Sequence, residues 1–268
     1  MRNLKGKFIH LTGSVPVDSP GHDVALVKRF VAGLTEGILR NGGGLVVLVN
    51  KGEPNSTIPF DWDAIEAAVE FETVFQSGRI LLRTVRRSDY QSALSDEQLE
   101  LLEGIARNTE DQPIPVRDWT GGTIRRRQLQ QADAAIIIGG SRGVEDTAKL
   151  MRKAGKPVLP LNFHVGSQSR EAGGARLYEE SLTNPGSYMP RTHRAISTQT
   201  DALHVRDDTS AERVASEVVS IIANEMRRPS WLRRIGGKVQ TVYRKSDPVL
   251  NIIFRANAGY NLSQNIPL

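Results

Sequence analysis

The chain has 268 residues, and 39% of them are hydrophobic. This length is enough for one large α/β domain or two small ones. The chain contains no cysteine, which excludes disulfides, zinc–thiolate sites and thiol nucleophiles and fits a reducing cytoplasm. The apolar run 8–11 is too short for a signal peptide, and no stretch approaches the roughly 20 apolar residues of a membrane helix. We therefore expect a cytoplasmic protein without a membrane segment.

The positive charge of the chain is concentrated at its C-terminal end. The formal net charge is +5 overall, but it is +7 for residues 226–268 and −2 for the other 225 residues. We therefore expect a nearly neutral domain at 1–226 and a basic extension at 227–268. Aromatic and basic residues are interleaved in this extension, which suits contact with nucleic acid and also an arm that packs on another subunit. Since no recognised nucleic-acid motif accompanies it, we favour an arm that contacts another subunit or a partner protein.

Strands and helices alternate along the first 226 residues. Short β-branched apolar runs predict buried strands, and apolar residues three or four apart predict amphipathic helices. This alternation predicts a doubly wound, Rossmann-like α/β fold, in which helices cover both faces of a mostly parallel sheet. The region 162–209 has weak periodicity, so we expect it to consist mainly of loops. In chain order, the expected elements are a strand at 8–11 with a turn at 12–16, a helix over 24–38, a strand at 45–49, a helix at 61–75, a strand at 80–85, helices at 95–105 and 120–131, a strand at 134–138, a helix at 144–154, a strand at 158–161 and a helix at 210–226.

A glycine-rich turn between a buried strand and a helix is the most informative pattern in the sequence. Gly139, Gly140 and Gly143 fall within five residues, directly after the apolar run 134–138. Such a turn lets the backbone approach a ligand closely, and the helix that follows presents unpaired N–H groups with partial positive charge. This combination favours the binding of a phosphate or a carboxylate. A purely structural strand-to-helix turn is the alternative.

The first strand provides a second candidate segment, because Gly13 and Ser14 follow it. In doubly wound sheets, ligands bind at the carboxyl ends of the strands where the strand order reverses, so both segments are expected at one edge. A ligand with two phosphates would then contact both. The glycines would allow close approach, and the hydroxyls of Ser14 and Ser141 would donate hydrogen bonds. The guanidinium groups of Arg126 and Arg142 would neutralise the charge.

Several of these residues also have a structural interpretation. The arginines at 125–127 cannot all face one pocket, because successive helical residues point about 100° apart. The two serines could instead cap the segments that follow them. Neither a dinucleotide-binding fingerprint nor a P-loop is present. The five histidines show no metal-binding spacing, so we expect neither a metal nor a cofactor, and a nucleotide would be a ligand.

The strand, the turn and their flanking sequences resemble the SLOG superfamily over about residues 6–226. This superfamily includes the "lonely guy" nucleotide phosphoribohydrolases, DNA-uptake proteins related to Smf, and sensor domains attached to Sir2 or TIR enzymes in bacterial antiphage systems. The last branch is the one that Gly173-Gly174-Ala175 resembles. The other resembling segments are Asp133-Ala134 with its apolar strand, the turn 139–143, Gly155-Lys156-Pro157-Val158-Leu159-Pro160, and the opening strand 8–14.

The resemblance implies a domain that binds a nucleotide or an NAD-derived signal similar to cyclic ADP-ribose, in antiphage defence, with a change of oligomeric state. In the phosphoribohydrolases a catalytic glutamate closes the glycine motif. That position is Thr147 here, and Glu145 and Asp146 lie one or two residues earlier. We therefore expect binding rather than turnover, in a homo-oligomer. Two alternatives stay open: an N-glycosidic hydrolase of a nucleotide or NAD that uses Glu145 or Asp146, and a protein that handles single-stranded DNA.

Overall fold

A seven-stranded sheet forms the centre of the structure and is parallel except at one short strand. The computed structural model describes residues 3–16, 19, 21–50, 57–140, 142–161, 173–192 and 208–227. Six strands follow one another in the order β5-β4-β2-β1-β6-β7, and β3 pairs antiparallel with β1. The strands are β1 (Phe8–Pro16), β2 (Gly44–Val49), β3 (Thr57–Pro59), β4 (Leu82–Arg87), β5 (Thr109–Ile114), β6 (Ala134–Gly139) and β7 (Val158–Leu161).

The strand order reverses between β1 and β6. From β1 the chain adds β2, β4 and β5 on one side, and it then returns to place β6 and β7 on the other side. This arrangement confirms the predicted doubly wound, mostly parallel α/β fold. It also places the switch point, where sheets of this type bind ligands, at the carboxyl ends of β1 and β6.

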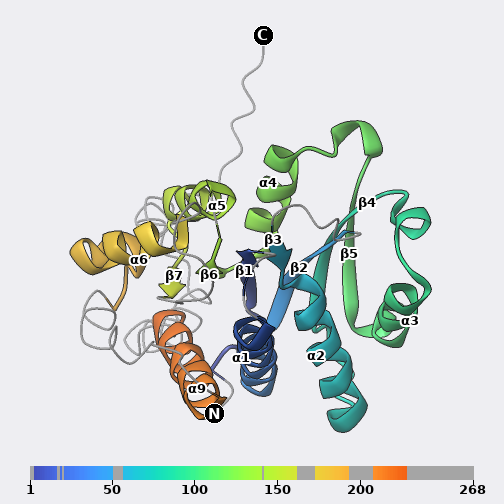
Figure 1. Ribbon diagram of the computed structural model, residues 1–268, viewed down its shortest axis with the longest axis horizontal. Helices are drawn as coiled ribbons and strands as arrows, with labels where there is room; N and C mark the ends of the chain where they lie inside the picture. Colours follow the sequence, from blue (N-terminus) through green and yellow to red (C-terminus); the bar gives the residue numbers. More distant parts are fainter. Residues whose placement is uncertain are drawn as a thin grey trace, which may run out of the picture. The chain divides into compact units, whose positions relative to one another are not determined.

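Helices cover both faces of the sheet (Figure 1). Helices α1, α2 and α9 lie on one face, whereas α4, α5 and α6 lie over the other. No helix in the described part of the chain is long and apolar enough to cross a membrane. Among the described residues, the α-helices are α1 (Gly21–Arg40), α2 (Asp61–Phe75), α3 (Asp96–Gly104), α4 (Gly121–Gln131), α5 (Arg142–Lys153), α6 (Gly173–Thr183), α7 (Pro185–Tyr188) and α9 (Asp208–Glu225), and short 3₁₀ helices span Tyr90–Ala93, Ala106–Asn108 and Val116–Asp118.

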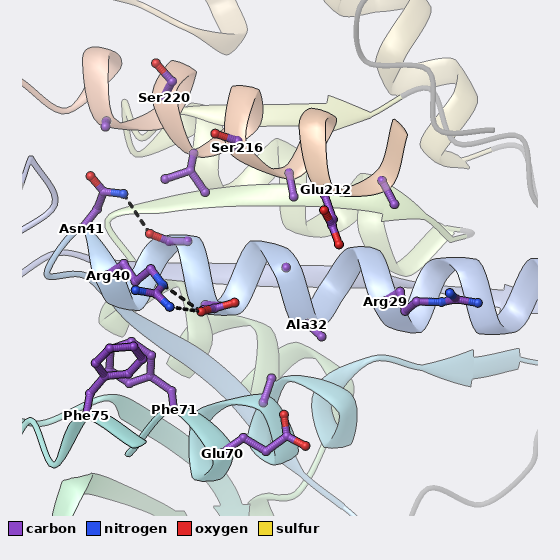
Figure 2. Close-up of a pocket in the computed structure, with 18 of the residues that line it drawn as sticks. Arg29, Ala32, Arg40, Asn41, Glu70, Phe71, Phe75, Glu212, Ser216 and Ser220 are labelled. Carbon is purple, nitrogen blue, oxygen red and sulfur yellow. Dashed lines mark hydrogen bonds and ion pairs between the residues drawn. The ribbon is translucent and has the colours of Figure 1, made fainter. Parts of the chain in front are cut away.

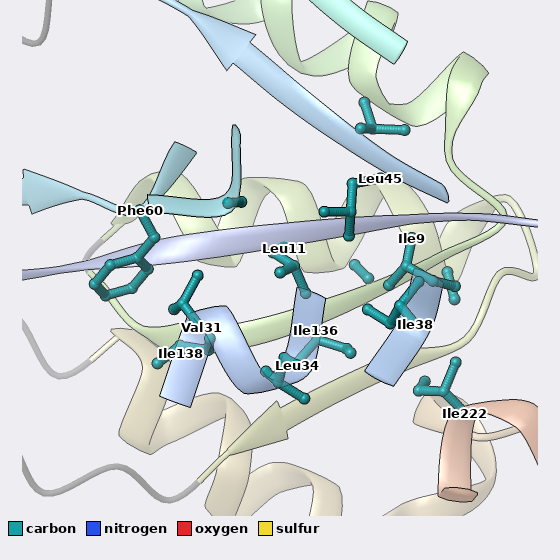
Figure 3. Packing of buried hydrophobic residues seen from close by; sticks show 14 of the residues in the cluster. Ile9, Leu11, Val31, Leu34, Ile38, Leu45, Phe60, Ile136, Ile138 and Ile222 are labelled. Atoms are coloured by element: carbon teal, nitrogen blue, oxygen red, sulfur yellow. The ribbon is translucent and has the colours of Figure 1, made fainter. Parts of the chain in front are cut away.

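The main core lies between α1 and the central strands (Figure 3). Val31, Leu34 and Ile38 recur at helical spacing on α1 and are buried with Ile9 of β1 and Ile136 of β6. Full burial of each such side chain contributes roughly 1.5–3 kcal/mol to folding. The apolar face that predicted α1 is therefore the face that attaches this helix to the sheet.

Local signals define the ends of several elements correctly. Helix α2 and strand β7 have the predicted bounds. Ser95 caps α3 in a capping box: its hydroxyl accepts a hydrogen bond from the amide of Gln98, whose side chain accepts one from the amide of Ser95 at 3.1 Å. Thr120 caps α4 in the same way, accepting a hydrogen bond from the amide of Thr123 at 3.2 Å.

Other elements differ from the prediction. Strand β5 is missed because residues 110–113 are exposed at the edge of the sheet and form no apolar run. Strand β3 is missed because it has only three residues. The strand predicted at 80–85 begins two residues later, as β4.

The prediction that 162–209 consists mainly of loops is wrong for its described middle part. Residues 173–183 and 185–188 form α6 and α7. Only a narrow side of α6 is buried, which leaves a weak apolar pattern in the sequence. Residues 162–172 and 193–207 lie outside the described part of the chain, as does the predicted basic extension beyond Arg227.

Candidate functional site

The carboxyl ends of β1 and β6 bring the two predicted glycine segments side by side. Gly13 is paired with Ile138, and Ser14 with Gly139, across the parallel ladder. A Cβ placed on Gly140 would lie only 3.3 Å from the Cα of Gly13. Two stretches more than 120 residues apart in the sequence therefore share the switch point of the sheet.

The prediction of a turn at 12–16 is wrong, because β1 continues to the end of this segment. Here β1 pairs antiparallel with β3, and Ser14 lies opposite Pro59. Strands thus flank the backbone of Ser14 on both sides. The β-branched residues Thr12 and Val15 favour this extended conformation. Because its backbone is paired on both sides, Ser14 can contact a ligand at this edge only through its side-chain hydroxyl, and the residue is half-buried.

Two glycines at this junction are required by the packing of the protein itself. A Cβ on Gly13, whose φ is +146°, would lie 1.9 Å from the carbonyl oxygen of Ile138. A Cβ on Gly140, whose φ is +84°, would lie 2.7 Å from a methyl group of Val144. Any larger residue would force the strands apart or adopt a strained backbone conformation. These glycines alone do not indicate a ligand, which must be inferred from the groups around them.

The first turn of α6 packs against the same junction. The amide of Gly174 donates a hydrogen bond to the carbonyl oxygen of Gly140 at 3.1 Å. A Cβ on Gly174 would lie 2.4 Å from the carbonyl oxygen of Gly139. The sequence connects residues 173–175 with the site only through the family resemblance, although the glycine pair is a signal for close backbone contact. The first turns of α5 and α6 therefore both lie at the end of β6.

The predicted cations lie on exposed helix surfaces. Arg142 is the exposed first residue of α5. The neighbouring Gly143 is also exposed, and a Cβ on it would meet no atom within 4 Å. Arg126 is exposed on α4, which packs against α5. Ser141 lies outside the described residues, so its predicted hydrogen bond to a phosphate stays a prediction.

The two candidate carboxylates on α5 are both engaged in ion pairs. Glu145 pairs with Arg176 of α6 at 2.5 Å, and Asp146 pairs with Arg125 of α4 at 3.4 Å. Thr147, at the position of the family glutamate, is buried, and its hydroxyl donates to a carbonyl oxygen of its own helix at 3.1 Å. In this state α5 presents no unpaired carboxylate to a ligand at either of the two predicted positions.

Asp61 is a titratable group at the same sheet edge that the sequence prediction missed. It begins α2 two residues after β3, and its carboxylate accepts a hydrogen bond from the amide of Leu48 in β2 at 2.7 Å. Burial raises the pKa of this carboxyl to about 7, against the opposing effect of the hydrogen bond from Leu48. An aspartate before an apolar helical pattern suggests only a helix start, so the sequence carries no signal of this perturbation.

His10 is buried in β1, as expected for a structural histidine. Its Nδ1 lies 3.1 Å from the carbonyl oxygen of Val46, and burial lowers the pKa of the imidazole to about 4. The ring is therefore neutral at physiological pH. Within the described part of the chain, no group of three or more histidine, aspartate or glutamate side chains is arranged to hold a metal ion.

A groove lies on the α1 face of the sheet, along α1 and between α2 and α9 (Figure 2). This groove has a volume of about 960 Å³. Arg40 projects into it, but its guanidinium pairs with Glu36 at 2.6 Å and stacks 4.5 Å from the centre of the Phe75 ring. The groove is large, yet none of the predicted site residues lines it.

Comparison with known proteins identifies relatives by sequence. A protein family described as "ATP nucleosidase Cap17-like, N-terminal" matches residues 4–236 of the chain. Two curated relatives, both called ATP nucleosidase Cap17, come from Escherichia coli strain KTE188 and from Escherichia coli. Each is 29% identical over 238 residues, which cover 86% of this chain and 46% of the relative. The chain thus spans about half the length of the curated relatives it matches.

Solved structures give weaker likenesses. The molybdenum cofactor carrier protein from Chlamydomonas reinhardtii is 15% identical with a TM-score of 0.39, over 81% of this chain and 98% of that one. An X-ray structure from the Northeast Structural Genomics Consortium is 15% identical with a TM-score of 0.40, over 65% of this chain and 81% of that one. The sequence family matches most of the chain, and the chain therefore belongs to the family of Cap17-like ATP nucleosidase N-terminal regions.

Proposed function

We propose that this chain binds a phosphate-bearing nucleotide at the junction of β1, β6, α5 and α6. The observation that supports this most strongly is the position of two helix first turns at the switch point of a doubly wound sheet. The amides in the first turn of α5 have no partner within the helix, carry partial positive charge and attract phosphate groups, whereas the amide of Gly174 in α6 holds the junction together through Gly140. Because the relatives are named ATP nucleosidases, ATP is the first nucleotide to test.

The groups at the junction suggest how a phosphate would be held. Gly143 lies in the first turn of α5, where its amide has no partner within the helix. Arg142 beside it could place two parallel N–H donors on one phosphate. The hydroxyl of Ser14 would donate from β1, and the hydrogen bond predicted for Ser141 belongs to the same proposal.

Calorimetric titration with ATP, ADP, AMP and adenosine tests this binding. We expect ATP to bind, affinity to fall as phosphates are removed, and Arg142→Ala to weaken ATP binding by tenfold or more, because a charge-assisted hydrogen bond contributes about 1.5–3 kcal/mol. Arg40→Ala is the matched control, since it removes an arginine from the groove on the other face. If none of these nucleotides binds, or if only Arg40→Ala weakens binding, the proposal fails.

A second candidate function is N-glycosidic hydrolysis of the nucleotide, which the name of the relatives favours. Water would attack C1′ of the ribose, the bond from C1′ to the base would break, and the base would leave with a proton. Carboxylates stabilise the cationic transition state of such reactions. Glu145 and Asp61 are the candidates at this edge, although Glu145 is paired with Arg176 in this structure.

Chromatography of ATP incubated with the purified chain separates the two functions. Release of free adenine, with loss of this release in Glu145→Gln or Asp61→Asn, would support hydrolysis. Unchanged ATP in the presence of calorimetric binding would support recognition without turnover. In this structure both α5 carboxylates are held in ion pairs, Glu145 with Arg176 and Asp146 with Arg125.

The identity of the ligand, self-association and DNA binding each require a separate experiment. We propose an NAD-derived ligand as an alternative to ATP, so cyclic ADP-ribose isomers belong in the same titration. The self-association proposed as part of the antiphage context would be supported by a nucleotide-dependent change in molar mass, measured by light scattering. Binding of single-stranded DNA that weakens with salt and disappears on truncation after residue 226 would instead favour the DNA-handling alternative.

A further inference from the structure

The ion pair between Glu145 and Arg176 connects the two helix first turns at the proposed nucleotide site. Glu145 lies in the first turn of α5, and Arg176 follows Gly174 by two residues in the first turn of α6. Gly174 is itself hydrogen-bonded to Gly140 of the β6 turn. The pair therefore lies where an incoming phosphate would meet both helices.

The two partners of this pair differ in exposure. The side chain of Arg176 is 67% exposed, whereas that of Glu145 is 29% exposed. An ion pair with one partner open to water is held weakly, because solvent screens the charges and the arginine retains much of its freedom. A phosphate can replace a single carboxylate oxygen with two parallel hydrogen bonds to the same guanidinium. The exposed guanidinium of Arg176 is therefore accessible to a competing anion.

We propose that Arg176 is a phosphate-binding residue of the nucleotide site and that the nucleotide takes it from Glu145. This inference rests on the proposed nucleotide binding and names a residue for it that the sequence prediction lacks. While it is paired with Glu145, the positive charge of Arg176 is neutralised. In the occupied site Arg176 contacts the phosphate, and Glu145 is released as an unpaired carboxylate next to the ligand.

Neighbouring residues on α5 provide a matched control for the charge change. Asp146 follows Glu145 directly and pairs with Arg125 of α4, on the other side of the helix from α6. Glu145→Gln and Asp146→Asn each remove one negative charge and each release one arginine. Only the first releases an arginine on α6, so a difference between them reports on Arg176 and not on net charge.

Calorimetric titration of ATP at one ionic strength tests the proposal with four proteins. We expect Arg176→Ala to weaken binding at least tenfold and Glu145→Gln to strengthen it at least threefold, while Asp146→Asn stays within twofold of the unmodified chain. The Nε–H signal of Arg176 can be assigned in NMR spectra as the one that is missing from Arg176→Ala. In the unmodified chain this signal should shift when ATP is added.

The possible failures can be distinguished. If the unmodified chain binds no nucleotide, the proposed function itself fails and the role of Arg176 falls with it. If the unmodified chain binds ATP, but Arg176→Ala binds equally well, the proposed function stands and the role of Arg176 is overturned. Equal strengthening by Glu145→Gln and Asp146→Asn would also overturn it, because long-range charge would then explain both.

Discussion

Replacement of Gly143 by alanine separates the folding role of this residue from its proposed binding role. The residue is the second of α5, it has ordinary helical geometry, and a Cβ on it would meet no atom within 4 Å. The other glycines of the junction cannot be used in this way, because a Cβ on Gly13 or Gly140 would collide with neighbouring atoms. Gly143→Ala therefore adds a methyl group only to the surface that the nucleotide would cover.

The expected effects of this change have opposite signs. Alanine in place of glycine in a helix reduces the freedom of the unfolded chain and stabilises the fold by roughly 0.5–1 kcal/mol. For a unit of this size, the melting temperature should rise by about 1–4 °C. The same methyl group would stand beside the amide that faces the phosphate, so we expect ATP to bind at least tenfold more weakly.

Gly122→Ala is the matched control, because Gly122 is the second residue of α4, is exposed, and also has no atom within 4 Å of its Cβ position. Thermal unfolding and calorimetry give a melting temperature and an ATP affinity for each variant. Both variants should be stabilised similarly, and only Gly143→Ala should lose affinity. Unchanged ATP binding by a stabilised Gly143→Ala protein would refute the reasoning that α5 presents its first turn to the ligand.

Three further predictions concern stability. Gly13→Ala should destabilise the fold by about 3 kcal/mol or more, measured by urea unfolding, because its Cβ would lie 1.9 Å from the carbonyl oxygen of Ile138. A loss of stability below about 1 kcal/mol would contradict this close contact between β1 and β6. The pKa of His10 is about 4 in the folded protein, against an ordinary 6.5, so about 3 kcal/mol of stability that is present above pH 6.5 should be lost as the pH falls to 4. His10→Gln should flatten this pH dependence of the unfolding free energy, measured by urea titration, and an unchanged pH dependence would exclude His10 as its source. Asp61 should give the opposite pH dependence of stability, because its pKa is raised from 3.8 to about 7 and its stabilising effect is lost as the pH rises through this range. Asp61→Asn should therefore raise the melting temperature more at pH 8 than at pH 5, and an equal rise at both pH values would argue against a perturbed carboxyl.

The fold could be predicted largely from the sequence because its signals are local. Five buried positions in succession in β6 and the repeated apolar face of α1 define the layers. Caps such as Ser95 define helix ends to within a residue. Strand β5 could not be predicted, because it lies at the sheet edge and is held by pairing with β4 and not by apolar side chains of its own.

The candidate site was harder to predict, because its key contacts join distant segments. The pattern around Gly139 predicts a change from strand to helix, and β6 does end at Gly139 with α5 beginning at Arg142, but nothing near Gly13 shows that β3 will pair with the strand there. The pairing of Glu145 with Arg176 depends on α6, which follows a stretch without clear periodicity. The raised pKa of Asp61 depends on burial, which only the tertiary structure produces.

A crystal structure of this chain with ATP tests the central claim most directly. We predict that phosphate oxygens lie within hydrogen-bonding distance of the first-turn amides of α5, at the carboxyl ends of β1 and β6. Density for ATP in the groove along α1, with an empty junction at Gly139 and Gly140, would contradict the account.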